Sequence, residues 1–308
     1  MEKDPGRGGN TLLEEKKETL YRAMYSAQPS FDDFKGYTGY SNGMLRSDKE
    51  WLDEKSASIY NSEWKDADDD FARYMEPVVT YILNREELLP TRDNFAFLAS
   101  EYDDKRNGTD IVFGVENNEF ENDTIVSIDV ATGTLLDNIA KKFANSFDKH
   151  NGTAYIKYCM HNEKRWREPD ALHFVIGMSP ASQNKAFDKI NVANGELKGR
   201  ETDFDSDFII LSEMREQIRM QLADLKRRPA DEIVEQRKAK LDDLAAPINT
   251  GICRTLGINF AEYPTKEERN RVFRERYLEK QRELSKIDAV YKNIIGLAID
   301  RTRGAKIL

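Results

Sequence analysis

The chain has 308 residues, of which 33% are charged, and it carries a formal net charge of −9 at pH 7. This length is sufficient for a hydrophobic core and predicts one elaborated domain, or one domain with a helical appendage. No apolar run of about 18 residues occurs and no apolar stretch follows the polar first residues, so we expect no contact with a membrane, no secretion and a cytoplasmic location.

Residues 1–60 are predicted to form a loosely ordered N-terminal arm. Most of this stretch mixes Gly, Ser, Lys, Asp and Tyr without sustained periodicity, and only 12–25 has the pattern of a short helix. From Asp66 to Asn84 apolar residues recur at helical steps, which predicts an amphipathic helix that Pro77 interrupts.

The segment 61–203 is predicted to be an α/β core. After its first helix, the piece 95–100 reads as helical or irregular, and a polar loop follows it. The later apolar runs predict strands at 110–116 and 124–131, a helix at 134–149, strands at 153–160 and 171–178, and a helix at 180–190. This order predicts a mixed central sheet of about four strands flanked by helices.

Residues 204–308 are predicted to form a mostly helical extension. Charged helical patterns cover 208–228 and 230–246, and 266–299 reads as one long amphipathic helix or two. From Pro264 to the C-terminus there are 12 Lys and Arg against seven Asp and Glu, so this end is basic although the chain is acidic. Such a surface is suited to a nucleic-acid backbone, and the long charged helices are also suited to a homodimer. An exposed helix with paired charges would give the same pattern.

Two acidic residues stand in β-rich runs. Asp110 follows Gly-Thr and opens the run Ile-Val-Phe, and Asp129 lies in the middle of Ser-Ile-Asp-Val-Ala. An acid in a strand is disfavoured unless it is paired or bound to metal. If the two runs pair as neighbouring strands, both carboxylates lie at one end of the sheet, where Mg²⁺ or Mn²⁺ would find the oxygen ligands it prefers. Alternatively, Asp110 ends a turn by bonding to backbone N–H groups.

The arrangement resembles the PD-(D/E)XK nuclease superfamily, with its restriction-endonuclease-like core. That core has a helix bearing a Glu, a strand with the Asp, and a strand with an acid, a spacer and a Lys. The likeness covers about residues 65–190. It implies that Asp110 and Asp129 are catalytic magnesium ligands and that Glu76, on the preceding helix, is an auxiliary acid. Glu101 and the pair Asp103-Asp104 are rivals for this third acidic position.

The lysine of the family pattern is displaced in this chain. Two positions after Asp129 stands Ala131, where the family has Lys. Some members of the superfamily supply the cation from the next helix, where Lys141 and Lys142 lie. Lys142 borders the apolar stripe of that helix and Lys141 points away, so Lys142 is the candidate to orient water or to stabilise the phosphate. Two alternatives remain. Lys142 could cover the edge of the core with its aliphatic stem and keep its charged end in water, or Lys157 of the next strand could supply the catalytic cation.

Other catalytic chemistry has little support. His150, His161 and His173 lack the spacing of zinc ligands. Cys159 and Cys253 are far apart and are expected to be small buried residues without a disulfide. Cys159 and His161 share a strand face, yet nothing in the sequence activates them as nucleophile and base.

The sequence therefore predicts a metal-dependent nuclease that hydrolyses phosphodiester bonds of nucleic acid, with DNA as the expected substrate. The alternative is a nuclease-like scaffold without activity, which binds a protein partner or dimerises through the charged C-terminal helices. Ala131, in place of the expected lysine, favours the alternative.

Overall fold

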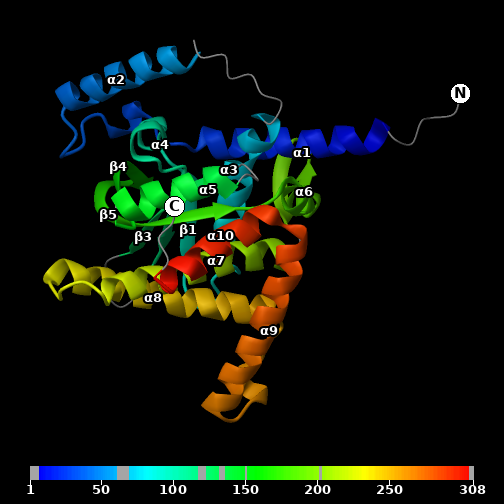
Figure 1. The fold of residues 1–308 in the computed structure, drawn as a ribbon. Coiled ribbons are helices and arrows are strands. Elements are labelled where there is room, and N and C mark those ends of the chain that lie inside the picture. Colours follow the sequence, from blue (N-terminus) through cyan, green and yellow to red (C-terminus); the bar gives the residue numbers. More distant parts are fainter. Residues whose placement is uncertain are drawn as a thin grey trace, which may run out of the picture.

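The computed structural model describes residues 7–60, 69–116, 123–131, 136–149, 151–200 and 203–304. It contains a five-stranded mixed sheet flanked by helices and a helical C-terminal region (Figure 1), which confirms the predicted fold class. The sheet has the order β1-β2-β3-β5-β4 and consists of β1 (Asn94–Leu98), β2 (Ile111–Val115), β3 (Thr124–Ala131), β4 (Thr153–His161) and β5 (Lys164–Gly177). A separate hairpin consists of β6 (Ile190–Ala193) and β7 (Glu196–Arg200).

The described helices surround this sheet. They are α1 (Arg7–Ser26), α2 (Asn42–Tyr60), α3 (Asp69–Leu83), α4 (Glu101–Asn107), α5 (Leu136–Ala144), α6 (Pro180–Asp188), α7 (Phe204–Leu225), α8 (Glu232–Thr255), α9 (Lys266–Ile287) and α10 (Ala289–Thr302). Shorter turns are η1 (Phe31–Phe34), the π-helical η2 (Asn145–Lys149) and η3 (Phe260–Glu262). No helix in these described ranges is long and apolar enough to cross a membrane.

The sheet combines an antiparallel meander with a parallel crossover. β1, β2 and β3 follow one another antiparallel, whereas β5 runs parallel to β3. The connection from β3 to β5 passes through α5 and β4, and β4 pairs with β5 as an antiparallel hairpin. Helix α5 thereby lies beside the end of β3, with Ile139 and Phe143 packed against Ala131 and Val175.

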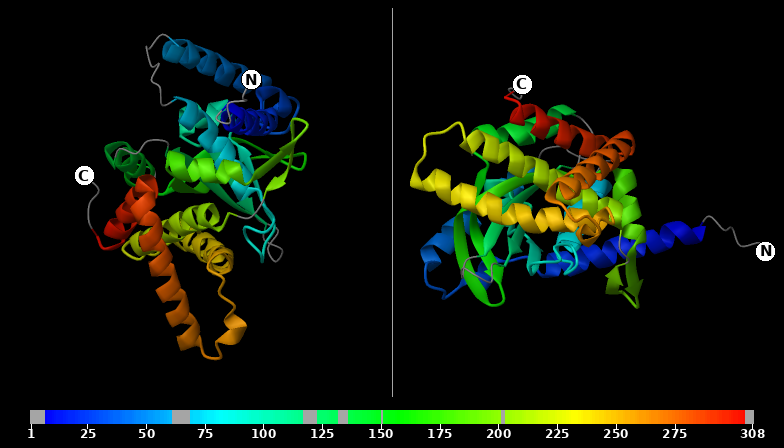
Figure 2. Two further views of the ribbon diagram at one scale, coloured as in Figure 1. Left: turned by 90° about the vertical axis from the view of Figure 1, so that its right-hand side faces the viewer. Right: turned by 90° about the horizontal axis from the view of Figure 1, so that it is seen from below.

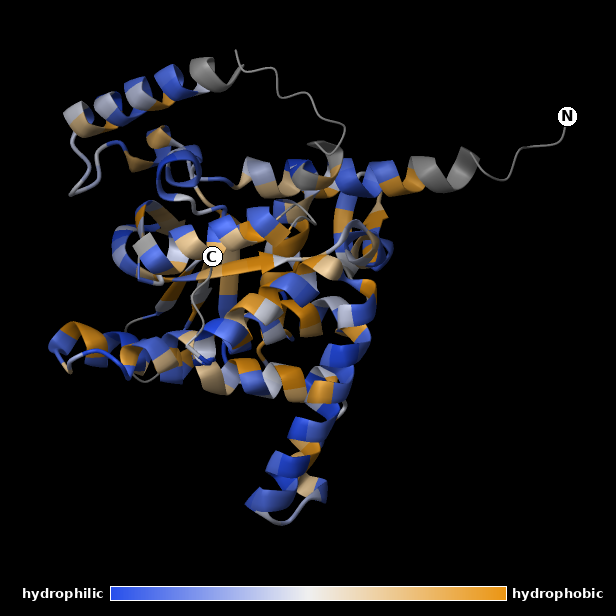
Figure 3. Ribbon diagram, in the orientation of Figure 1, coloured by the Kyte–Doolittle hydropathy of each residue, from blue (hydrophilic) through white to orange (hydrophobic). Residues whose placement is uncertain are grey.

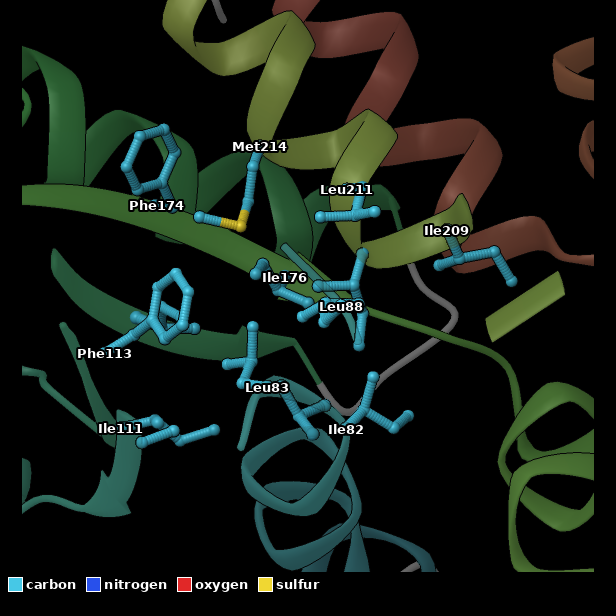
Figure 4. Packing of buried hydrophobic residues seen from close by; sticks show 14 of the residues in the cluster. Ile82, Leu83, Leu88, Ile111, Phe113, Phe174, Ile176, Ile209, Leu211 and Met214 are labelled. Carbon is cyan, nitrogen blue, oxygen red and sulfur yellow. The ribbon is translucent and has the colours of Figure 1, made fainter. Parts of the chain in front are cut away.

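The main hydrophobic core lies on the opposite face of the sheet. Helices α3, α7 and α8 cover this face, and their apolar side chains interdigitate with those of the strands. Figure 4 shows this packing for Ile82, Leu83, Leu88, Ile111, Phe113, Phe174, Ile176, Ile209, Leu211 and Met214. The predicted helical extension therefore contributes directly to the core of the α/β fold.

The N-terminal segment differs from the loosely ordered arm that its composition predicts. Its described part contains α1 and α2, and Leu20 of α1 is fully buried in the main core. Lys16 Nζ donates to the carbonyl of Asp188 at 3.0 Å, and Tyr40 Oη donates to the carbonyl of Trp166 at 2.6 Å. These contacts join residues more than a hundred positions apart. Local periodicity in the sequence cannot predict such long-range contacts.

The stretch before β2 also differs from the prediction, because it contains a strand and a helix. β1 is an edge strand, and the side chain of Asn84 substitutes for a neighbouring strand. Ala96 N donates to Asn84 Oδ1 at 3.0 Å and Asn84 Nδ2 donates to Ala96 O at 2.9 Å. Ser100 caps the start of α4, and Gly108, in the left-handed region with φ 66°, ends it.

One boundary in the C-terminal half follows from a cap. The stretch 266–299, predicted as one helix or two, is two helices, because Asp288 caps α10 by accepting from Tyr291 N at 2.9 Å. The same carboxylate accepts from Ser179 N at 2.8 Å and so ties this junction to the end of β5. The predicted helix 134–149 appears as α5 followed by η2, and residues 132–135 lie outside the described residues.

Helix α7 completes the free edge of β5 with a side chain. Val175 N donates to Gln217 Oε1 at 2.8 Å, and Gln217 Nε2 donates to Val175 O at 2.7 Å. All of these groups are buried. The amide of Gln217 thus replaces a strand where the β4 pairing has ended.

Replacing Gln217 by Ala is expected to destabilise the protein by about 2–4 kcal/mol, because two buried backbone groups lose their partners. Denaturant unfolding of the purified variant measures this loss. The matched control is Gln236→Ala on the exposed surface of α8, which should change the free energy of unfolding by less than about 0.5 kcal/mol. Equal stability of the two variants would contradict the edge-completing role.

Candidate active site

Asp110 and Asp129 meet at one end of the β2–β3 pair. Ile111 lies opposite Ile128 in the antiparallel register, so the next pair of positions is Asp110 and Asp129. The Asp110 N–H donates to the carbonyl of Ile128 at 2.9 Å. Its carboxylate turns toward β3, where Oδ2 accepts from Val130 N at 2.6 Å. The alternative role of Asp110 is met in part, because its carboxylate does accept from a backbone N–H, although that N–H belongs to the neighbouring strand and lies beside the second acid.

Lys142 enters the same place from α5. Its ammonium donates to Asp129 Oδ1 and, at 2.7 Å, to the carbonyl of Val130. Lys141, by contrast, is exposed on α5. Lys157 lies elsewhere, in an ion pair with Asp48. Of the three candidate lysines, Lys142 is the one whose ammonium contacts a candidate metal ligand.

Glu76 and Asp104 complete the group from two further helices. Glu76 of α3 accepts from Tyr25 Oη of α1 at 3.3 Å. Asp104 of α4 interacts with the carboxyl group of Asp110, and this interaction lowers the pKa of Asp104 against the larger, opposite effect of burial. Glu76 also interacts electrostatically with Asp104 and Asp129. We call the five residues Glu76, Asp104, Asp110, Asp129 and Lys142 the carboxylate cluster.

The other acidic rivals have different roles. Glu101 is exposed and pairs with Lys105 one turn along α4. Asp103 is fully buried, and its carboxylate accepts from Lys157 N at 2.8 Å and Tyr158 N at 2.9 Å. Asp103 therefore anchors α4 to β4 and does not face the cluster.

The cluster has an excess of negative charge. Burial, together with Asp129, Glu76 and Asp104, raises the pKa of Asp110 well above its usual range, against the opposing effect of Lys142. Burial is also the largest cause that raises the pKa of Glu76 to about 7 and that of Asp104 to about 6. Burial lowers the pKa of Lys142, but the carboxylates outweigh it and the net shift is upward. One ammonium thus faces four acids, which is an environment that favours a proton or a further cation.

The carboxylate oxygens of the cluster are suited to a hard divalent cation that is held by two protein ligands. Among the described residues, no three His, Cys, Asp or Glu side chains are arranged as a metal-binding group. Mg²⁺, however, commonly takes one or two protein carboxylates and keeps several waters. Asp110 and Asp129 would be those two ligands. The oxygens of Asp129 and Val130 already face a cation, the ammonium of Lys142.

A cavity of about 520 Å³ adjoins the cluster at Asp129. Its walls include Tyr155, Arg106 and His173. His173 Nδ1 lies 2.9 Å from Ser127 Oγ, and that hydroxyl lies 2.8 Å from Thr109 Oγ1, so a buried chain of hydrogen bonds runs from the cavity toward the start of β2. The cavity gives a substrate of nucleotide size a place beside the acids.

Sequence patterns do not identify three residues of this region. Asp104 is indistinguishable from the other acids of its polar stretch, because only the helix α4 between Ser100 and Gly108 decides which of them faces Asp110. Tyr25 comes from the segment predicted to be an arm. His173 has no sequence neighbour that marks it, and its place beside Ser127 follows only from the parallel register of β3 and β5.

Cys159 and His161 do not form a nucleophilic site. Burial raises the pKa of the Cys159 thiol well above its usual range, which suppresses the reactive thiolate. The His161 ring stacks on Phe95 with ring centroids 3.8 Å apart. Both cysteines are free and buried.

The structure brings together the residues that the sequence singles out from three separate elements. Asp110 and Asp129 lie at the β2–β3 end, Lys142 contacts Asp129, and Glu76 approaches from α3. Asp104 is a fifth member. Comparison of the chain with protein-family models, curated proteins and solved structures finds no match.

Proposed function

We propose that the protein is a metal-dependent nuclease that hydrolyses phosphodiester bonds of nucleic acid, with DNA as the expected substrate. The observation that carries this proposal is the convergence of Asp110, Asp129, Glu76 and Lys142 from α3, the β2–β3 pair and α5. The proposal includes membership of the PD-(D/E)XK nuclease superfamily. The order of α3, β2, β3 and α5 supports it, because the family resemblance places the Glu-bearing helix, the two acid-bearing strands and the next helix in this order.

The carboxylates would hold the ion and manage the protons. Asp110 and Asp129 are the proposed ligands of Mg²⁺ or Mn²⁺, which when bound would supply charge neutralisation and acidify a water molecule. Glu76 and Asp104, whose pKa values are about 7 and about 6, can hold or release a proton near neutral pH. Such values suit an auxiliary acid or base for the attacking water or the leaving oxygen.

Lys142 is the proposed electrostatic partner of the phosphate. Its ammonium contacts Asp129 and the carbonyl of Val130. With Asp129 serving as an ion ligand, Lys142 would be free to donate to a phosphate oxygen. A fixed cation at that position stabilises the negative charge that develops in the transition state. The adjoining cavity would receive the nucleotide beside the scissile bond.

Cleavage of plasmid or single-stranded DNA in the presence of Mg²⁺ or Mn²⁺ tests this function. The reaction should depend on the metal and stop when the metal is chelated. Single-stranded RNA as a parallel substrate would distinguish a deoxyribonuclease from a ribonuclease. Absence of cleavage of all these substrates at millimolar metal would reject the proposal.

A second candidate is a nuclease-like scaffold without activity that binds a protein partner or forms a homodimer through its charged C-terminal helices. Two observations favour it: Lys142 already neutralises Asp129, and the described residues contain no three-ligand metal group. Ala131 also occupies the position of the family's lysine and is buried against α5 and α10.

Calorimetric titration with Mn²⁺ separates the two candidates. The nuclease proposal predicts saturable binding at millimolar metal or below, lost in Asp110→Asn because one of two ligands is replaced. The exposed Asp137→Asn on α5 is the control and should bind as the unmodified protein does. Absence of binding heat in the unmodified protein would favour the scaffold.

A further inference from the structure

A cavity of about 720 Å³ lies between α7, α9 and α10, away from the carboxylate cluster in the fold. Helix α9 projects from the body of the molecule with its N-terminal end, and α10 follows from its C-terminal end, which lies against the body (Figures 1 and 2). Much of the surface of α9 is hydrophilic (Figure 3). We call this space the α9 cavity, and the lining residues used below are Arg215, Glu216, Arg219, Phe273, Arg274, Tyr277, Gln281 and Arg303.

The lining of the α9 cavity has an excess of positive charge. Four arginines face a single acid, Glu216. Glu216 is buried and already serves three donors: Arg215, Arg219 Nη1 at 2.8 Å and Tyr277 Oη at 2.9 Å. The negative charge of Glu216 is therefore neutralised by groups of the protein itself, and it does not neutralise Arg274 and Arg303.

Two of these arginines have no acidic partner among the described residues. Within the described part of the chain, Arg274 and Arg303 make no ion pair, and both side chains belong to exposed residues at the rim. Guanidinium groups match phosphate oxygens with two parallel N–H donors. The rim is thus suited to an anion with more than one negative charge.

Arg215 is held in place before any ligand binds. Its Nε donates to Asn249 Oδ1 at 3.0 Å, and its guanidinium lies 4.4 Å from the ring centroid of Tyr277. The rings of Tyr277 and Phe273 stack at an angle of 15°, with centroids 5.7 Å apart. A preorganised cation and an aromatic wall therefore stand side by side, and this lowers the entropic cost of binding a ligand that is both anionic and planar.

Gln281 adds an incompletely satisfied donor to the lining. Its residue is only 9% exposed, and its amide nitrogen forms no hydrogen bond of full geometry, although it interacts weakly with the hydroxyl of Tyr291. Buried donors are nearly always satisfied, since leaving one without an acceptor is costly. An acceptor oxygen or ring nitrogen of a bound molecule would satisfy it.

We propose that the α9 cavity binds a small phosphorylated ligand with a planar ring, of the nucleotide class, with Arg274 and Arg303 on the phosphates and Phe273 against the ring. The volume lies within the range of about 300–1,000 Å³ that is usual for small-molecule sites. This site is independent of the proposed nuclease function, because it shares no lining residue with the carboxylate cluster.

Calorimetric titration with ATP, pyrophosphate and adenosine tests the proposal. The buffer contains EDTA and no divalent metal, so that the carboxylate cluster does not contribute. ATP is expected to bind more tightly than pyrophosphate, and adenosine much more weakly, because both the charge and the ring contribute. Asp129→Asn should bind ATP unchanged, whatever the outcome of the nuclease assay.

Variants assign the contacts. Arg274→Gln should weaken ATP and pyrophosphate binding by about tenfold or more, through loss of a charge-assisted contact. Phe273→Ala should weaken ATP but leave pyrophosphate unchanged. Arg282→Gln is the matched control, because Arg282 is exposed on the same helix and does not line the cavity. Circular dichroism confirms that each variant is folded.

Three results would overturn the proposal. One is the absence of saturable ATP binding in the unmodified protein. Another is an equal loss of affinity in Arg282→Gln and Arg274→Gln, which would indicate general attraction to the helix surface. The third is binding of an oligonucleotide without binding of ATP, which would assign the arginines to a nucleic-acid backbone.

Discussion

Asp129→Asn is expected to lower the rate of metal-dependent DNA cleavage by about 1,000-fold or more, to the background of the assay. The substitution keeps the size of the side chain but removes the charge that a divalent ion requires. It also removes the carboxylate that forms an ion pair with Lys142. The measurement is the initial rate of conversion of supercoiled plasmid to nicked and linear forms at saturating Mg²⁺ or Mn²⁺.

Asp137→Asn is the matched control for this experiment, because Asp137 is an exposed acid on the helix that carries Lys142. It should cleave at the rate of the unmodified protein. Persistent, metal-dependent cleavage by purified Asp129→Asn would reject Asp129 as a ligand and with it the proposed active site.

Lys142→Met separates the role of the ammonium from that of the ligands. Without Lys142 the four acids lose the one cation that belongs to the carboxylate cluster, with Lys105 acting only on Asp104 from outside it, so Mn²⁺ should bind at least as tightly as before. Cleavage should nevertheless fall by about 100-fold or more, since the charge that stabilises the phosphate is gone. Lys141→Met, one residue away and exposed, should retain activity. A Lys142→Met protein that cleaves normally would leave the lysine with a structural role alone.

The predictable part of the fold is the part with regular periodicity. The two acid-bearing strands, the two strands of the later hairpin and the helix with Lys142 are all apparent from alternating or helical patterns, and the register of Ile111 with Ile128 brings the acids together. Edge strand β1 escapes prediction, because its pairing on the free side is completed by one side chain, Asn84. Helix α2 escapes it because aromatic contacts to distant residues order it. The helical pattern at 12–25, by contrast, does indicate part of α1.

The candidate site is predictable to a similar extent. Asp110 and Asp129 are conspicuous because acids are unusual in apolar strands, and Lys142 follows from the face of its helix. No sequence feature distinguishes Glu76 from other acids on helices. Which of Glu101, Asp103 and Asp104 faces Asp110 depends on the orientation of α4, which the sequence does not give. The α9 cavity is not accessible to sequence patterns at all, because its arginines come from three helices and a charged helix face usually implies only solvent.

The metal-free protein is expected to be more stable at pH 5.5 than at pH 8, because its carboxylate cluster favours bound protons. The pKa values of Glu76 and Asp104 are raised to about 7 and about 6 in the folded state. For an acid whose folded pKa exceeds its unfolded value, the stabilising contribution is present below the unfolded pKa and is lost as pH rises through the folded pKa. The loss should therefore extend from about pH 4 to about pH 7.5, and the part of it that falls between pH 5.5 and pH 8 should amount to about 1–3 kcal/mol.

Glu76→Gln is expected to remove much of this loss and to raise the melting temperature at pH 8 in EDTA by about 2–6 °C. The amide cannot ionise and can still accept from Tyr25 Oη. Addition of Mn²⁺ should also raise the melting temperature of the unmodified protein at pH 8, because the ion binds the folded state. Thermal unfolding by circular dichroism at the two pH values measures each shift, with Asp137→Asn as the control that changes neither. If Glu76→Gln lowers the melting temperature at pH 8, the acids are compensated within the protein, and the excess negative charge that would attract a metal ion does not exist.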